Sequence, residues 1–415
     1  MKRALKIAGT VLTVLVVIVL ALAIYVHLSW DRTIDRPVPA LSAPRDSASI
    51  ARGEHLFKDT WQCWTCHASP ATDGNAPPSG GMVFDLRATG PGFGLFYSKN
   101  LTPDSATGLG AWTDGEIVQA IREGVTRERR MLFPIMPVDW LKGLSDRDAL
   151  ALVAYLRSIP PVTDPVHANE PSFVAKALVA FGVIRPVPAI TAPIAAPLPE
   201  PTPQYGQYFA MHGAGCADCH CPRNLSNGRF YDDSLFSGSS VAFGNPRLTP
   251  LTSYARNITP DNTDGIGLWN EGQFTNAVTM GLRPDSTVLD PHMPYSGYKA
   301  LSDDELRAVY LFLKSLPPIP RAVPPTAFSP QLQNARGVER GKLIYQARCL
   351  TCHGTEGTGA RPTSVKLTEV AGSMTDQELM DFIAAGQLNL KMPAFGKTLK
   401  PDELVDLVAY VRTWK

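Results

Sequence analysis

Four residues that could do chemistry, Cys216, Cys219, His220 and Cys221, lie in the short stretch GCADCHCP. Two thiols separated by two residues are typical of a redox dithiol or of half a zinc site. With the following histidine they match C-x-x-C-H, the pattern to which haem c is covalently attached. With Cys221 added, three thiols and one imidazole could form a compact metal cage. This stretch alone leaves all of these interpretations open.

The C-x-x-C-H pattern occurs three times, which favours haem attachment over the alternatives. Each thiol would form a thioether with a haem vinyl group, and the adjacent histidine would bind the iron. Three copies therefore predict three covalent haem c groups. The attaching residues are Cys63, Cys66 and His67, then Cys216, Cys219 and His220, then Cys349, Cys352 and His353. Cys221 is left over, either as a buried inert thiol or as a thiol bonded to a partner subunit.

A longer internal repeat identifies candidates for the second axial ligand of each iron. Residues 100–160 align without a gap on residues 257–317, with about a third of the positions identical, as expected for duplicated structural units. A Met-Pro pair recurs in this repeat, at Met136 and Met293, and again near the C-terminus at Met392. A thioether can remain next to iron because it has no proton to lose.

The repeat also limits the alternatives to these methionines. Met131 aligns with a valine in the second copy, so it does not recur. Packing in the core is the alternative role for any methionine, and His292 is a rival ligand directly before Met293. Lys99 and Arg256 occupy equivalent positions before a repeated Asn-x-Thr-Pro-Asp. Each could pair with a haem propionate or remain a solvated surface charge.

Helix signals surround each motif and no strand pattern is comparably strong. A glycine opens a helical stretch before each motif, at Gly53, Gly206 and Gly341. Capping-box patterns begin further helices at Thr113, Ser145, Ser302 and Thr375. The last helix starts at Pro401, and its apolar face consists of Leu404, Leu407, Val408 and Val411. The sequence therefore predicts an all-α chain of three tandem class I cytochrome c-like domains, each with one covalent haem.

The N-terminus predicts a transmembrane helix. Lys2, Arg3 and Lys6 precede an uncharged run from Ile7 to Val26, long enough to cross a bilayer core. The positive flank predicts that this end stays in the cytoplasm and that the rest is exported. The alternative is a signal peptide cleaved after residues 21–23, Ala-Leu-Ala.

Proline-rich stretches divide the chain into compact units. The predicted segments are an anchor at 1–28, linkers at 29–46, 163–203 and 319–331, and cytochrome domains at 47–162, 204–318 and 332–415. We refer to these three domains as the first, second and third units. Residues 172–184 in the second linker are apolar but too short to span a bilayer. They could lie in the membrane interface, dock on a partner subunit or pack across the cytochrome units.

These motifs resemble the triple-haem cytochrome c subunits of bacterial membrane-bound alcohol, gluconate and aldehyde dehydrogenases. The resemblance covers residues 47–415 and implies an electron-transfer subunit on the periplasmic side of the inner membrane. It implies a catalytic partner carrying flavin, pyrroloquinoline quinone or a molybdenum cofactor, and a small third subunit is a further candidate. The acceptor would be ubiquinone or a terminal oxidase. Two departures leave the choice of catalytic partner open, namely the retained anchor and a bulkier insertion at residues 68–96.

Two other classes of function compete with electron transfer. A peroxidase-like haem enzyme would need an open distal site and a nearby acid or base, for which His55, His212 and His292 are the candidates. A zinc-bound or redox-regulated interaction protein would use the C-x-x-C pairs without haem. The formal net charge of +1 gives no basis for a nucleic-acid partner.

Overall fold

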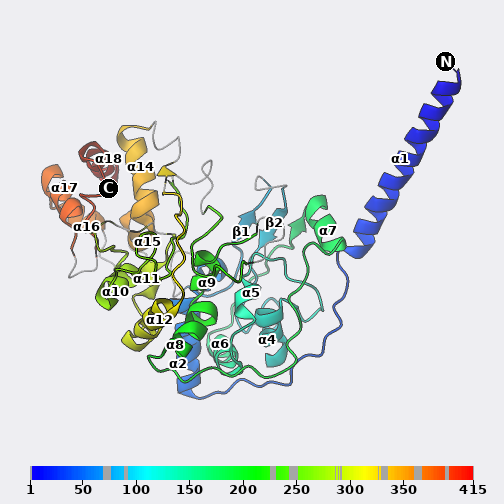
Figure 1. The fold of residues 1–415 in the computed structure, drawn as a ribbon, viewed down its shortest axis with the longest axis horizontal. Coiled ribbons are helices and arrows are strands. Elements are labelled where there is room, and N and C mark those ends of the chain that lie inside the picture. Colours follow the sequence, from blue (N-terminus) through cyan, green and yellow to red (C-terminus); the bar gives the residue numbers. More distant parts are fainter. Residues whose placement is uncertain are drawn as a thin grey trace.

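The computed structural model of the chain is mainly helical and carries two small antiparallel sheets (Figure 1). It describes residues 2–68, 76–87, 92–224, 230–242, 251–285, 287, 289, 292–325, 327–328, 335–358, 367–387 and 392–414. Parts of the predicted insertion (69–75 and 88–91) and the predicted boundary at 331 lie outside these residues.

The strands are the difference from the all-α prediction. Strand β2 (Gly94–Tyr97) pairs with β1 (Val83–Asp85) on one side and with β3 (Glu170–Pro171) on the other. A second pair joins β4 (Leu251–Thr252) to β5 (Ala327–Phe328). All five lie in connecting segments or linkers and contain two to four residues. Such short strands are too brief to produce a detectable alternation of apolar and polar residues.

The helices of the first and second units follow the same order, and those of the third follow a different one. The first unit contains α2 (Ser47–His55), η1 (Leu56–Thr60), α3 (Trp64–His67), α4 (Asp114–Glu123), α5 (Val138–Leu141) and α6 (Asp146–Ser158). The second contains α8 (Pro203–Tyr208), η2 (Phe209–Gly213), α9 (Cys216–His220), α10 (Glu271–Met280), α11 (Tyr295–Tyr298) and α12 (Asp303–Ser315). The third contains α14 (Gly337–Arg348), α15 (Leu350–His353), η3 (Thr355–Gly357), α16 (Leu367–Ala371), α17 (Asp376–Ala385) and α18 (Pro401–Val411).

Local capping explains where these helices begin. Complete capping boxes occur at Thr113, Ser302 and Thr375, each with its Glu partner three residues later, and Ser145 caps α6 through its side chain. Helix α18 starts with a proline at its first position and buries the four predicted apolar residues. The sequence predictions for these helix starts are therefore confirmed.

The three glycines before the motifs have a different role from the one predicted. Gly53, Gly206 and Gly341 lie inside α2, α8 and α14, where each helix crosses the last helix of its unit. A Cβ on any of the three would lie 1.9 Å from a backbone carbonyl oxygen of that last helix. The glycines therefore permit a close crossing of two helices and do not open them.

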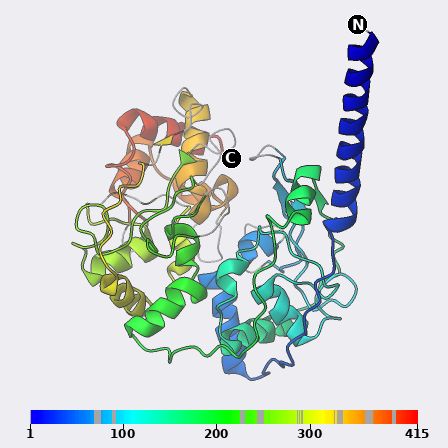
Figure 2. The same ribbon diagram turned by 45° about the vertical axis from the view of Figure 1, so that its right-hand side comes forward.

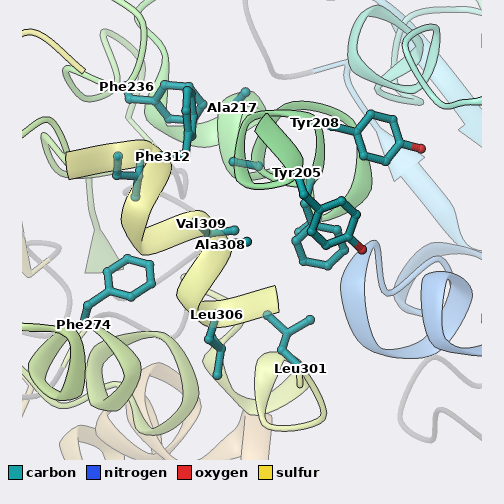
Figure 3. Packing of buried hydrophobic residues seen from close by; sticks show 14 of the residues in the cluster. Tyr205, Tyr208, Ala217, Phe236, Phe274, Leu301, Leu306, Ala308, Val309 and Phe312 are labelled. Carbon is teal, nitrogen blue, oxygen red and sulfur yellow. The ribbon is translucent and has the colours of Figure 1, made fainter. Parts of the chain in front are cut away.

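Each unit has its own hydrophobic core. Separate clusters of buried residues surround Leu56 in the first unit, Phe209 in the second and Tyr345 in the third. Figure 3 shows the second cluster, in which Phe236 packs against Phe312 of α12, and Tyr205 of α8 lies on the side of Ala308 and Val309. Trp61 packs against both the first and second clusters. The first two cores are therefore in contact.

Helix α1 (Lys2–Ser29) extends away from the three units in both views (Figures 1 and 2). Within it, residues Lys6–Ser29 are apolar and long enough to cross a membrane, and their most apolar window is not buried by the rest of the chain. At its C-terminal end it contacts α7 (Phe173–Ala180), which lies in the predicted second linker.

Candidate haem-attachment sites

Each C-x-x-C-H motif forms a single helical turn. The backbone N–H of His67 donates to the carbonyl of Cys63 at 2.9 Å, and His353 makes the same bond to Cys349. Helical neighbours three and four positions apart lie on the same face, so both thiols and the imidazole project together. This is the arrangement that a planar group attached through two sulfurs and one nitrogen requires.

The motif thiols are held in the protonated form by their surroundings. All seven cysteines lie in the described residues and none forms a disulfide. Burial raises the pKa of Cys63, Cys216 and Cys349 to about 12. Zinc binds the thiolate and not the thiol. Within the described residues there is also no group of three or more His, Cys, Asp or Glu side chains placed to hold a metal ion, so the geometry does not favour the zinc interpretation.

The first two motif histidines are fixed in one tautomer by equivalent hydrogen bonds. The Nδ1 atom of His67 lies 2.9 Å from the carbonyl oxygen of Lys99, and that of His220 lies 2.7 Å from the carbonyl oxygen of Arg256. A carbonyl only accepts, so Nδ1 carries the proton and Nε2 keeps its lone pair. Burial also lowers the pKa of both imidazoles. A neutral ring with an available Nε2 is the form that binds iron.

Lys99 and Arg256 thus contribute through their backbones, which the sequence reasoning did not foresee. Their side chains donate to backbone carbonyls of the following linkers, Lys99 to His167 and Arg256 to Val323. The chain from motif histidine to carbonyl spans 32 residues in the first unit and 36 in the second. The segment between motif and carbonyl is therefore not longer in the first unit than in the second.

The third motif is described less completely. His353 Nδ1 is buried without a hydrogen-bond partner in the described structure, and residues 359–366 shortly after it are not described. Burial lowers the pKa of His353, and the positive charge of Lys299 lowers it further. Lys299 follows α11 of the second unit, so the third motif lies close to the second unit.

The predicted distal methionines lie with their motifs. Met136 and Cys63 pack against the first cluster, Met293 and Cys216 against the second, and Met392 and Cys349 against the third. Met293 is half-buried, whereas the rival His292 is exposed. Met131, however, lines the same cavity as Met136, so in the first unit the repeat and not the geometry separates the two.

A cavity of about 1130 Å³ in the first unit tests whether a haem fits these residues. Its lining includes both thiols of the first motif, His67 and Met136, and the remaining walls are largely apolar. This volume exceeds the ~300–1,000 Å³ of ordinary small-molecule pockets. The donor set and the apolar walls both suit a large flat group bound through sulfur and imidazole. The residues therefore fit haem c.

The first two sites meet at a shared seam that sequence reasoning missed. Trp61, two residues before the first motif, donates from Nε1 to the backbone carbonyl of His212 at 2.8 Å. Gln62 donates from Nε2 to the carbonyl of Pro294, the proline of the second Met-Pro pair, at 3.3 Å. The cavity of the first unit is also lined by Cys219 of the second motif. The first and second sites are therefore adjacent.

A buried ionic network ties the same two units together. Arg52 bridges Asp148 of its own unit and Glu305 of the second, and His55 contacts Glu305 at 3.0 Å. Tyr208 of the second unit donates to Asp148 at 2.8 Å. Under the internal repeat Asp148 corresponds to Glu305, and alignment of the first two C-x-x-C-H motifs places His55 on Tyr208. The recurrence of these polar residues was the sequence feature from which the contact between the two units could have been predicted.

The histidines nominated for peroxidase chemistry are engaged elsewhere. Burial would lower the pKa of His55, but hydrogen bonds to Asp59 and Glu305 outweigh it and raise the pKa to about 9. His212 Nδ1 lies 2.8 Å from the carbonyl of Trp140. None of His55, His212 and His292 is among the residues that line the described cavity. The arrangement gives no support to these three histidines as an acid or base at the first site.

Cys221 is buried and its sulfur accepts a hydrogen bond from the backbone N–H of Phe236 at 3.3 Å. Burial raises its pKa to about 12. A protonated, enclosed thiol is poorly placed for a bond to another chain. The geometry therefore favours the inert-thiol interpretation.

Comparisons with known proteins agree with these sites. The family model described as cytochrome c matches residues 50–160, and the model described as cytochrome c oxidase, cbb3-type, subunit III matches residues 336–411. The chain is 28% identical over 93% of its length to a subunit of the nicotinate dehydrogenase of Pseudomonas putida, of which it spans only 32%.

Two further relatives are matched over most of their own length. The gluconate 2-dehydrogenase cytochrome c subunit of Pantoea cypripedii is 28% identical over 88% of this chain and 86% of that protein. The cytochrome c subunit of the quinone-type alcohol dehydrogenase of Gluconobacter oxydans is 27% identical over 88% of this chain and 78% of that protein.

Proposed function

The chain belongs to the family of cytochrome c subunits of membrane-bound dehydrogenases, and we propose that it carries electrons through three covalent haem c groups. Haem c supplies one-electron redox chemistry when bound. The observation that carries the proposal is that each C-x-x-C-H motif shares a hydrophobic core with its own Met-Pro methionine. Each motif histidine and its methionine would then supply the protein ligands of the iron.

The residues that would hold the three groups follow from the motifs. The thioether-forming residues are Cys63, Cys66, Cys216, Cys219, Cys349 and Cys352, and the axial ligands are His67, Met136, His220, Met293, His353 and Met392. We place one group in each of the three predicted domains, 47–162, 204–318 and 332–415. With both axial positions filled by the chain, the iron would have no open position for a substrate.

The arrangement of the units supports a linear relay. The first and second sites meet where Gln62 contacts Pro294. The second approaches the third where the positive charge of Lys299 lowers the pKa of His353. Helix α11, which begins directly after Pro294, lies between these two contacts. The apolar cores exclude water from the sites and keep the protein groups in fixed positions.

The relatives suggest the electron donor. The proteins named above are subunits of nicotinate, gluconate and alcohol dehydrogenases. We therefore propose a catalytic dehydrogenase subunit as donor, with a flavin, pyrroloquinoline quinone or molybdenum cofactor, and ubiquinone or a terminal oxidase as acceptor. Helix α1 would anchor the chain in the bacterial inner membrane with the three units in the periplasm.

Counting covalent haem in matched variants tests the proposal. The full chain, purified in detergent, should carry three haem groups by intact mass and retain haem-peroxidase stain on a denaturing gel. Changing Cys63→Ala with Cys66→Ala should remove one group, whereas Cys221→Ser should leave all three. A wild-type chain with two groups or fewer, or with stoichiometric binding of carbon monoxide at two sites, would contradict the proposal.

A further inference from the structure

Helix α7 packs against the C-terminal end of α1. The ring of Tyr25 lies 5.4 Å from that of Phe181, and the Tyr25 hydroxyl donates to the carbonyl of Ala180 at 3.3 Å. Val26 is only 2% exposed, although its neighbours on α1 remain open. Figure 2 shows α7 beside the last turns of α1. The two helices therefore form one small unit at the point where the chain leaves α1.

Residues 173–184, which comprise α7 and the residues that follow it, also carry uncovered apolar side chains. Phe173, Phe181 and Val183 are each more than half exposed, and Val174 is 38% exposed. Exposed apolar side chains gathered on one short segment mark an interaction surface. This surface is continuous with the bare apolar surface of α1.

Aromatic and cationic side chains surround the junction. The ammonium of Lys176 lies 5.0 Å from the centre of the Trp30 ring, and the guanidinium of Arg32 lies 5.7 Å from that of Tyr25. Tyrosine and tryptophan gather at membrane–water interfaces, and lysine and arginine extend toward lipid headgroups there. The junction has the composition of an interfacial belt.

The depth of α7 follows from the length of α1. The apolar span Lys6–Ser29 has 24 residues. At ~1.5 Å per residue it extends about 36 Å, slightly more than a hydrocarbon core of ~30 Å. Its last turn, which α7 covers, would therefore lie at the outer boundary of the bilayer. The uncovered apolar side chains of residues 173–184 at this level would meet lipid.

We infer that residues 173–184, which include α7, form a second membrane contact, with the apolar side chains Phe173, Phe181 and Val183 inserted into the outer lipid interface. The inference rests on the proposed role of α1 as an anchor. Lys176 and Ala180 of α7 also line the cavity of the first unit. Two attachment points, α1 and residues 173–184, would thus hold the first site facing the membrane surface.

Photo-crosslinking of the full haem-loaded chain in phosphatidylethanolamine–phosphatidylglycerol nanodiscs tests this inference. A benzophenone amino acid is placed separately at Phe173, Phe181 and Val183, and phospholipid adducts are measured by mass. The positive control is Val19 on α1, and the water-exposed control is Leu268 in the second unit, 76% exposed. We expect at least about fivefold more lipid adduct at the three α7 positions than at Leu268, as for an interfacial helix.

The controls separate failure of this inference from failure of the anchor. Adducts at Val19 without adducts at the α7 positions overturn the inference and leave the anchor intact. A chain that lacks residue 19 or forms no adduct there overturns the anchor itself. The same variants irradiated in native membranes add one more outcome, because crosslinks from α7 to another protein in place of lipid would contradict the assignment to lipid.

Discussion

The contact of Glu305 with His55 and Arg52 gives a quantitative prediction for the seam between the first two units. Substituting Glu305→Gln keeps a good capping partner for Ser302 but removes the negative charge that both cations of the first unit use. Because breaking a buried ion pair leaves unpaired charges, we expect the change to loosen this seam. The ionic part of the loss should depend on pH.

The size of the effect follows from the shifted pKa values. The pKa of His55 rises from 6.5 to about 9. This shift corresponds to roughly 3 kcal/mol, which we reduce to about 2 kcal/mol because the side chain retains some solvent contact. Because Asp59 also hydrogen-bonds His55, we assign about 1 kcal/mol of this to Glu305. The pKa of Glu305 falls to about 2 through the same attraction, so the two shifts are not added. The ion pair with Arg52 adds roughly 1 kcal/mol, and this contribution stays constant in this pH range because the guanidinium remains charged.

The pH window follows from the sign of each shift. Because the pKa of His55 is raised on folding, its contribution is complete below pH 6.5 and disappears as the pH rises toward about 9. Because the pKa of Glu305 is lowered, its contribution is complete above pH 4.5 and disappears as the pH falls toward about 2. The ion pair therefore contributes fully between pH 4.5 and 6.5.

Urea unfolding of the full haem-loaded chain in detergent, followed by tryptophan emission, measures this contribution, since urea leaves the ionic strength unchanged. We expect Glu305→Gln to lower the unfolding free energy of the seam by about 2 kcal/mol near pH 6 and by about 1 kcal/mol near pH 9.5. The matched control is Asp304→Asn, an exposed carboxylate one residue earlier, which should change little at either pH. A loss for Glu305→Gln that is the same at both pH values would refute the reasoning.

Three further predictions follow from single contacts. Met136→Ala should let the reduced chain bind carbon monoxide at one additional site, whereas Met131→Ala should not; the reverse result would transfer the ligand role to Met131. Gly206→Ala should lower the unfolding free energy of the second unit, measured with urea, by about 3 kcal/mol, because its Cβ would lie 1.9 Å from a carbonyl oxygen of α12. Its control, Gly272→Ala on α10, should be neutral or slightly stabilising. Cys221→Ser should cost about 1 kcal/mol through burial of a hydroxyl, with intact mass unaffected by reductant before or after the change.

The parts that the sequence predicted are those with local causes. Helix starts at Thr113, Ser302 and Thr375 depend on side chains three residues apart, so their capping boxes were visible in the sequence. The C-x-x-C-H motifs are local in the same sense. The tertiary partners of the motifs were not visible, because they depend on which distant backbone atoms the fold brings near them. The carbonyl of Lys99 beside His67 is one such case.

The role of Gly53 shows the same limit. Its position before a motif suggested a helix start, and only the approach of the last helix of its unit reveals why a side chain is not tolerated there. A single glycine in a helical pattern is ambiguous between the two roles. The recurrence of such a glycine before every motif was the usable clue, because a helix start can be built from many residues. A crossing at which a Cβ would lie 1.9 Å from a carbonyl oxygen accepts glycine only.

The contacts at the seam are reciprocal, which bears on how the proposed relay would gain direction. Segment η1 of the first unit packs against α11 of the second, and η2 of the second packs against α5 of the first. The equivalent carboxylates Asp148 and Glu305 each accept from the other unit. Reciprocal use of equivalent surfaces is the property of a twofold interface, here made within one chain.

A symmetric pair alone would give its two sites similar surroundings, so any direction must come from the groups that break the symmetry. His55 carries a charge at this seam, whereas its counterpart Tyr208 is neutral and has its pKa raised by burial. The third cluster, which draws on residues from Leu343 onward, approaches the pair beside Lys299 of the second unit. A positive charge favours the more reduced state of a nearby redox group, because an added electron is stabilised by it. The charges of His55 and Lys299 therefore give the three otherwise similar sites different electrostatic surroundings.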